Sequence, residues 1–115
     1  MKKIEFTVLM CTYFYDDPKL LKLSIESIFK NTINPDFFIL TLDGEIPNKN
    51  LEIINKLKEK YKIQINVIKK NVGLALALNN ALKLVKTKWV ARADSDDINM
   101  IKRFEKQIEM AKNNY

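Results

Sequence analysis

The sequence predicts an α/β fold with a mostly parallel sheet and helices on both of its faces. Four short apolar, β-prone runs alternate along the chain with four segments in which apolar residues recur at helical spacing. This alternation is typical of parallel strands joined by helices. The 2 glycines and 3 prolines all fall in the expected turns, so the local signals agree with the long-range pattern.

Each expected strand is followed by a turn and then by an amphipathic helix. Asp16, Asp17 and Pro18 suit the start of the first helix, because a carboxylate accepts hydrogen bonds from free N–H groups and proline fits the first helical position. The run 74–84 is interpreted as the core-facing stripe of the third helix, and Asn99 as the cap of the fourth. The expected strands are residues 6–13, 37–42, 64–68 and 88–92, and the expected helices begin near 17, 48, 74 and 99.

Size and composition indicate a single globular domain over residues 1–115. Hydrophobic residues make up 47% of the chain and charged residues 30%. Because the chain stops after its fourth strand–helix unit, we expect it to be a fragment of a longer protein. No apolar run approaches the roughly 18 residues of a spanning helix, and the first residues lack the signal-peptide pattern. A cytoplasmic protein is therefore expected.

The charged and reactive residues exclude several kinds of site. The net charge of +6 comes from lysines spread along the chain without interleaved aromatic residues, so nucleic acid is not an expected partner. The chain has no histidine and one cysteine, Cys11. This excludes an internal disulfide, a cysteine-based zinc site and histidine-dependent nucleophilic catalysis. A bound metal would need oxygen ligands, as magnesium, manganese and calcium do.

Carboxylates follow three of the four expected strands. Ligands of open parallel sheets bind beyond the carboxyl ends of the strands, so these side chains are candidate binding residues. The segment 94–97 is the densest group, and it predicts a divalent cation shared with a diphosphate. An aspartate-rich turn that only caps a helix is the alternative interpretation, and the other acids on the same rim favour the metal site. The candidate acids are Asp16 and Asp17, then Asp43, then Asp94, Asp96 and Asp97.

Other polar residues at the strand ends suit a nucleotide. Asp43 could accept a hydrogen bond from a uracil imide or a ribose hydroxyl, and Thr12 could bond a base edge. Tyr13 could stack on a base or be a half-buried strand-end residue. Asn71 and Gly73 precede the third expected helix, whose N-terminus would face an anion or simply follow a turn. The phosphate-cradling P-loop pattern is absent from the chain.

In this order and spacing, these residues resemble the N-terminal part of the family 2 glycosyltransferases, which have the GT-A fold. The resemblance extends over nearly the whole chain. It rests on a series of segments: residues 8–13, the helix 20–32 with Ser24 and Ser27, residues 42–44, residues 71–73 with Asn79 in the following helix, residues 91–98, and residues 103–107.

The resemblance implies an inverting transferase that binds a nucleotide-diphospho-sugar, expected to be a UDP-sugar, through Mn²⁺ or Mg²⁺. The expected acceptor is a glycan or a lipid-linked molecule in polysaccharide synthesis, with peripheral association at the inner face of the membrane. The catalytic base, a carboxylate, is expected further along the protein, so no catalytic residue is expected within 1–115. The implied ligand contacts are Thr12, Tyr13, Asp43, Asn71, Gly73, Asp94 and Ser95 for the nucleotide and Asp94 and Asp96 for the metal.

The chain also departs from the family pattern. Leu42 replaces a frequent second acid, Leu78 a frequent basic residue, and Ile101 a frequent helix-opening proline. Two alternatives to the transferase remain open on the residues alone. A nucleotidyltransferase would need a glycine-rich basic loop after the first strand, where this chain has residues 12–18 without glycine or lysine. A non-catalytic α/β module with an acidic pocket would lack affinity for nucleotides.

Overall fold

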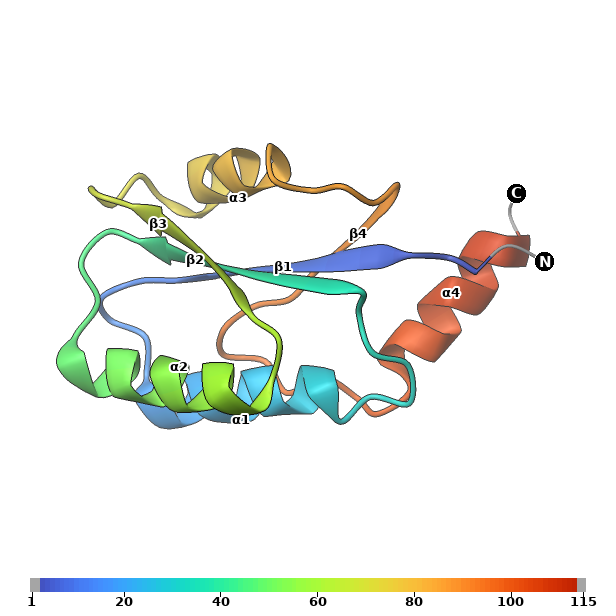
Figure 1. Cartoon of the computed structure of the whole chain (residues 1–115), viewed down its shortest axis with the longest axis horizontal. Coiled ribbons are helices and arrows are strands. Elements are labelled where there is room, and N and C mark those ends of the chain that lie inside the picture. The colour runs from blue at the N-terminus through green and yellow to red at the C-terminus, as the bar shows by residue number, and fades with distance from the viewer. Residues whose placement is uncertain (1–2, 114–115) are drawn as a thin grey trace.

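The computed structural model describes residues 3–113 as a four-stranded sheet and four helices (Figure 1). The strand order is β3-β2-β1-β4, and all three neighbouring pairs are parallel. The predicted α/β class with a parallel sheet is confirmed. The elements are β1 (Phe6–Thr12), α1 (Pro18–Phe29), β2 (Phe37–Asp43), α2 (Asn48–Lys60), β3 (Gln64–Ile68), α3 (Leu74–Leu82), β4 (Trp89–Arg92) and α4 (Arg103–Asn113).

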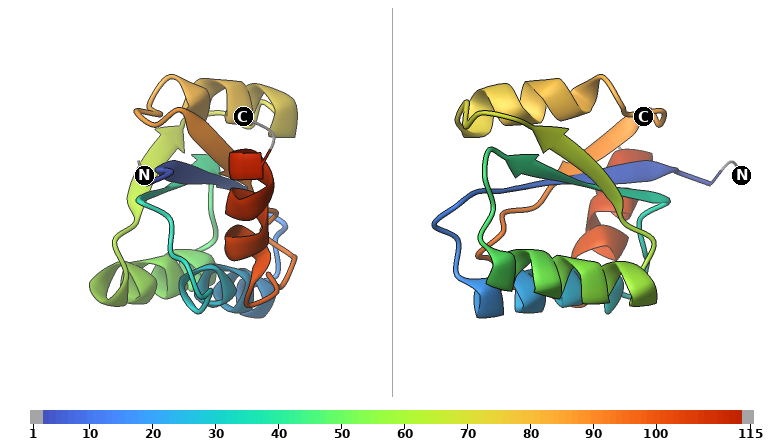
Figure 2. Two further views of the ribbon diagram at one scale, coloured as in Figure 1. Left: turned by 90° about the vertical axis from the view of Figure 1, so that its right-hand side faces the viewer. Right: turned by 60° about the vertical axis from the view of Figure 1, so that its left-hand side comes forward.

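The helices lie on both faces of the sheet, as the sequence predicts. α1 and α2 lie side by side beneath it, and α3 lies against the opposite face (Figures 1 and 2). The alternation of β1 explains this division. Phe6, Val8 and Met10 join the large core with α1, α2 and α4, whereas Leu9 points the other way and packs with Ala81 of α3. Both faces of β1 are therefore buried, as is typical of parallel sheets.

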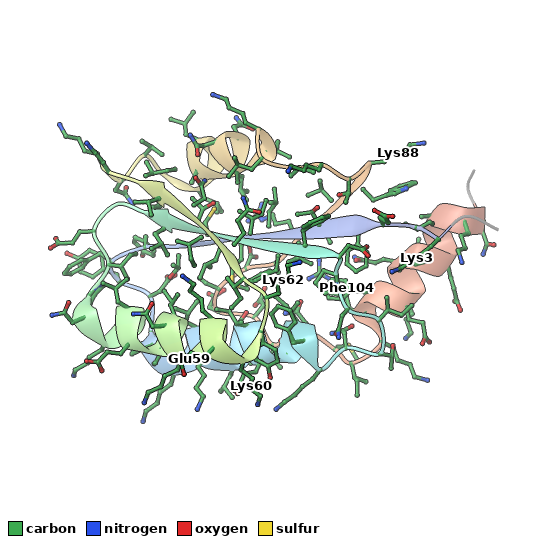
Figure 3. All side chains as sticks on the ribbon, viewed as in Figure 1. Lys3, Glu59, Lys60, Lys62, Lys88 and Phe104 are labelled. Carbon is green, nitrogen blue, oxygen red and sulfur yellow. The ribbon has the colours of Figure 1, made fainter. Side chains whose placement is uncertain are left out.

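α4 packs on the same face as α1 and α2 through one large anchor. Phe104 is buried, and its ring centroid lies 5.1 Å from that of Phe6. Burying a phenylalanine side chain contributes about 1.5–3 kcal/mol, enough to hold this end of α4 against the start of β1. The lysines, in contrast, spread over the surface: Lys3, Lys60 and Lys88 lie at well-separated places (Figure 3). No helix within residues 3–113 combines the length and apolar composition that crossing a membrane requires.

Two predictions about the helices need correction. α3 contacts the sheet through the small residues Ala77 and Ala81, while Leu74 and Leu82 are each 47% exposed. Its leucines are therefore not a buried stripe, because small side chains let this helix lie close to the sheet along a narrow line. α4 begins at Arg103, so Asn99 is not its cap. The caps predicted for α1 are confirmed, since the Asp17 carboxylate accepts from two backbone N–H groups and Pro18 opens the helix.

Candidate functional site

A pocket of about 400 Å³ lies at the carboxyl ends of the strands. From β1 the chain crosses to β2 on one side, and β4 pairs on the other side of β1. The loops after β1 and β4 diverge at this point, which is the usual ligand-binding position in open α/β sheets. The pocket is lined by Cys11, Tyr13, Asp16, Asp43, Asn71, Gly73, Leu74, Leu78, Arg92, Ala93, Asp94, Ser95 and Asp96.

Three larger hollows lie elsewhere on the described part of the surface. One, of about 730 Å³, follows the loop that leads into α4, one, of about 530 Å³, lies between β4 and α4, and one, of about 640 Å³, lies between α1 and α2. The first has two carboxylates in its lining, Asp94 and Asp97, the second has none, and the third has one, Glu26. Polar groups and perturbed charges mark a ligand site better than volume does, so the pocket at the strand ends is the candidate site.

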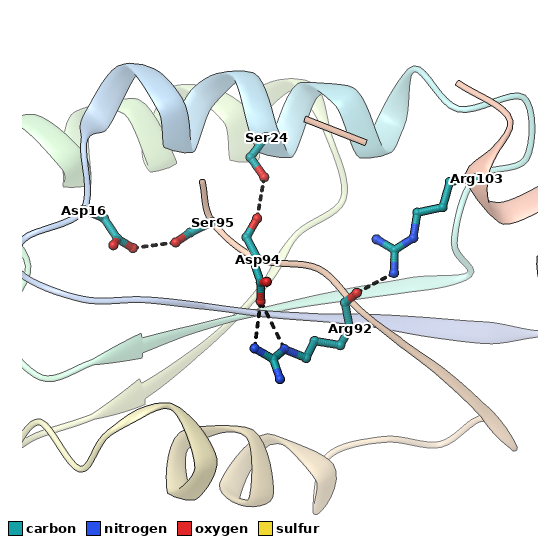
Figure 4. Close-up of polar contacts among 6 residues, drawn as sticks. All are labelled: Asp16, Ser24, Arg92, Asp94, Ser95 and Arg103. Atoms are coloured by element: carbon teal, nitrogen blue, oxygen red, sulfur yellow. Dashed lines mark hydrogen bonds and ion pairs between the residues drawn. The ribbon is translucent and has the colours of Figure 1, made fainter. Parts of the chain in front are cut away.

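Seven of the eight residues predicted as ligand contacts line this pocket, and Thr12 does not. Thr12 is buried, and its hydroxyl donates to Oδ2 of Asp16 over 2.7 Å. The same carboxylate oxygen accepts from the Ser95 hydroxyl over 2.7 Å and from the Tyr13 N–H over 3.3 Å. Asp16 thus joins the loop after β1 to the loop after β4 (Figure 4). Asp16 is one of the strand-end acids that the sequence marks as candidates, and the family resemblance assigns it no ligand contact.

On the β2 side, the Asp43 carboxylate holds the loop that leads into α3. Asp43 is 4% exposed. Its oxygens accept from the N–H of Val72 over 2.8 Å, from the N–H of Gly73 over 3.0 Å and from the amide of Asn71 over 3.2 Å. One charged side chain therefore fixes three consecutive residues of the pocket wall.

Gly44 makes this close approach possible. Its φ is +88°, a left-handed conformation that favours glycine, and its N–H donates to the carbonyl of Ile68 over 2.9 Å. A Cβ atom on Gly44 would lie 2.8 Å from the backbone nitrogen of Asn71. The Asp43-Gly44 turn is consequently required for the position of the 71–73 loop.

On the β4 side, Asp94 is held by an ion pair. Nε and Nη2 of Arg92 lie 3.1 and 3.0 Å from Oδ1 of Asp94. The backbone carbonyl of Asp94 accepts from the hydroxyl of Ser24 in α1 over 2.8 Å, and the carbonyl of Arg92 accepts from Arg103 (Figure 4). Sequence reasoning missed Arg92, because an arginine two residues before an acid on a strand is not by itself a signal.

The pocket is acidic although the chain is basic. Four aspartates line it (Asp16, Asp43, Asp94 and Asp96) against one arginine among the described residues, whereas the whole chain carries +6. The thiol of Cys11 responds to this environment: burial, and then the Asp43 carboxylate, raise its pKa to about 11. At neutral pH the thiol is protonated, so Cys11 is not an activated nucleophile.

The donor set fits a hard divalent cation. Carboxylate oxygens are the ligands that Mg²⁺ and Mn²⁺ prefer, and Asp94 and Asp96 lie in the same short loop. Within residues 3–113, no three acidic or thiol side chains converge closely enough to enclose a metal by themselves. A cation bound here would take its remaining ligands from water or from a phosphate, as Mg²⁺ commonly does.

The chain resembles characterised proteins over most of its length. The family described as glycosyl transferase family 2 matches residues 7–115. A UDP-Gal:alpha-D-GlcNAc-diphosphoundecaprenol beta-1,3-galactosyltransferase from Escherichia coli is 40% identical over 101 residues, which are 88% of this chain and 37% of that protein. The amylovoran biosynthesis glycosyltransferase AmsE from Erwinia amylovora is 35% identical over 103 residues, which are 90% of this chain and 39% of that protein. The chain therefore spans well under half the length of these relatives.

Solved structures share the fold. TarS 1–349 from S. aureus, in complex with UDP, matches 96% of this chain and 32% of that chain with a TM-score of 0.80 at 21% identity. The mannosyltransferase PcManGT from Pyrobaculum calidifontis, in complex with GDP-Man and Mn²⁺, matches 83% of this chain and 28% of that chain with a TM-score of 0.72 at 18% identity. At these identities the likeness establishes the GT-A fold alone. The sequence matches establish the family, and the chain belongs to the family 2 glycosyltransferases.

Proposed function

We propose that this chain is the nucleotide-sugar-binding part of a glycosyltransferase that takes a UDP-sugar together with Mn²⁺ or Mg²⁺. One observation carries the proposal. Asp43, Asp94 and Asp96 come from two segments about fifty residues apart in the chain, and they line one pocket at the strand ends.

In this proposal, different residues of the pocket bind different parts of the donor. Asp43 and Tyr13 lie where a base could be bonded and stacked, and the N-terminus of α3 at Gly73 presents the positive end of a helix dipole to the same pocket. Asp94 and Asp96 would hold the cation, which when bound neutralises charge on the diphosphate leaving group. The E. coli relative is named for UDP-Gal, and TarS is known with UDP, which supports a uridine nucleotide.

The acceptor is proposed to be a lipid-linked or glycan hydroxyl used in polysaccharide synthesis. The E. coli relative is named for a GlcNAc-diphosphoundecaprenol acceptor. A lipid-linked acceptor supports a cytoplasmic protein that associates peripherally with the inner face of the membrane. Inverting transfer would join the acceptor oxygen to the anomeric carbon while the bond from that carbon to the diphosphate breaks. A carboxylate base outside residues 1–115 would take the acceptor proton.

Binding of UDP with and without Mn²⁺ tests this function directly. We expect calorimetry to show UDP binding that is strengthened by Mn²⁺, and Asp96→Asn to remove the Mn²⁺-dependent part, since Asp96 is an exposed member of the pocket lining whose loss should not disturb the fold. Asp97→Asn is the matched control, because Asp97 is the next residue and lies outside this pocket lining. Absence of UDP binding at millimolar ligand would favour the non-catalytic module.

A further inference from the structure

Arg92 is the one cation among the described residues that line the pocket. Two nitrogens of its guanidinium, Nε and Nη2, both contact a single oxygen, Oδ1 of Asp94. The side chains of the pair are 53% and 43% exposed. Exposed ion pairs contribute only about 0–1 kcal/mol, so this pairing can be exchanged for another partner at little cost.

The backbone around the pair is fixed by separate contacts. Ser24 is buried and donates to the Asp94 carbonyl, Arg103 donates to the Arg92 carbonyl, and Ser95 donates to Asp16 (Figure 4). None of these bonds uses the carboxylate of Asp94 or the guanidinium of Arg92. The two side chains can therefore change partners while the loop that carries them stays in place.

We propose that Arg92 is an internal counter-ion that occupies Asp94 in the empty pocket and contacts the donor diphosphate in the filled one. The inference rests on the proposed function, because it requires a metal–diphosphate ligand. Asp94 then bonds the cation, and the released guanidinium pairs with a diphosphate oxygen. The planar guanidinium suits both partners, since it bonds carboxylates and phosphates through parallel N–H groups.

The charges of the pocket support this exchange. Four aspartates and one arginine leave an excess of three negative charges in the pocket lining (four minus one). The charges of a divalent cation and of a sugar-linked diphosphate nearly cancel, so the two together add little net charge to the pocket. Arg92 competes with a cation for Asp94 when no nucleotide is present, and it attracts the diphosphate when nucleotide is present.

This dual role predicts effects of opposite sign in one variant. Arg92→Gln should bind Mn²⁺ alone several-fold more tightly than the unaltered protein, because the competing cation is gone. The same variant should bind UDP at saturating Mn²⁺ about tenfold more weakly, as expected for loss of one charge-assisted contact. The affinities of Arg92→Lys for Mn²⁺ and for UDP should lie between those of the unaltered protein and those of Arg92→Gln, because lysine keeps the positive charge but lacks the planar guanidinium.

Binding of Mn²⁺ alone is measured by electron paramagnetic resonance of the free ion, and binding of UDP at saturating Mn²⁺ is measured by calorimetry. Lys102→Gln is the matched control, because it removes one positive charge from an exposed residue outside the pocket lining; it should change neither affinity appreciably. Circular dichroism checks that each variant is folded. A double variant with Asp94→Asn should show no further gain in Mn²⁺ affinity from Arg92→Gln, because the competition needs Asp94.

The outcomes separate this inference from the function on which it rests. In the first case, the unaltered protein binds UDP with Mn²⁺, and Arg92→Gln weakens the binding of both ligands or changes neither affinity. Arg92 is then not the exchanging counter-ion, and the proposed function stands. If the unaltered protein binds neither Mn²⁺ nor UDP, the proposed function and the inference are both overturned. Tighter Mn²⁺ with weaker UDP supports the exchange.

Discussion

Asp43 and Asp94 line the same pocket, but their carboxylates are held in opposite ways. Asp43 is 4% exposed and accepts three hydrogen bonds from the loop 71–73. The side chain of Asp94 is 43% exposed, and its partner is the guanidinium of Arg92, whose side chain is 53% exposed. Buried bonds to backbone N–H groups are costly to lose, whereas exposed ion pairs are not. The Asp43 carboxylate is thus part of the packed fold, whereas the Asp94 carboxylate is the one that our proposal has exchange partners.

The difference should appear most strongly when each carboxylate is removed. Asp43→Ala leaves the part-buried N–H donors of residues 72 and 73 without their acceptor, and we expect it to lower the free energy of unfolding by about 3 kcal/mol. Asp94→Ala should cost less than about 1 kcal/mol. Urea unfolding of both variants measures the two losses. Equal losses would show that the two sides of the pocket are not held differently.

Gly44 and Gly73 sharpen the same comparison, because both have positive φ values, +88° and +91°. Alanine at either position should cost about 1–3 kcal/mol for the positive φ. At Gly44 the added Cβ would also lie 2.8 Å from the nitrogen of Asn71, whereas at Gly73 nothing lies within 4 Å. Thermal unfolding should therefore rank Gly44→Ala as the less stable variant. The reverse order would mean that the β2 turn can move away from the loop.

The smallest effect is expected at Cys11, whose thiol pKa depends on charged residues from both sides of the pocket. Its pKa lies near 11 rather than 9.0, because of burial first and then of Asp43, while Arg92 acts to lower it. Alkylation should therefore be slow at pH 8 and rise with a midpoint near 11. Arg92→Gln should move that midpoint up, and Asp94→Asn should move it down, as followed by the rate of iodoacetamide labelling.

The same pKa shift fixes the direction of a stability change. The folded-state value lies above the ordinary one, so the fold favours the protonated thiol, and stability should decrease as pH rises from about 9 to about 11. A Cys11→Ala variant lacks this group, and its unfolding free energy should decline less over that range. A decline of the same size in both proteins would assign the effect to other groups.

The sequence predicted the elements and the rim acids because both depend on local pattern. Apolar alternation identified the four strands, the Asp17-Pro18 pair marked the start of α1, and topology then placed the strand-end acids on one edge. It could not predict the contacts between loops. The bond between Asp16 and Ser95 and the pairing of Arg92 with Asp94 depend on loop backbone geometry, which residue types do not determine.

The errors have a similar origin. The leucines of α3 match a helical period, and period alone does not reveal that alanines form the closest contact with the sheet. Asn99 has the residue type of a helix cap, but its amide and N–H bond Ser27 of α1 instead. Tertiary hydrogen bonds across about seventy residues therefore determined the position of the acidic loop.

The parallel pairing of β1 with β4 affects when the candidate site can form during folding. Phe6 of β1 pairs with Trp89 of β4. The three strand–helix units between the start of β1 and β4 must therefore be synthesised before these two strands can pair. Pairings between distant segments are slow to form during folding. Under the proposed function, recovery of UDP binding during refolding should therefore lag behind the recovery of helix followed by circular dichroism, because the pocket is complete only when the first and last strands pair.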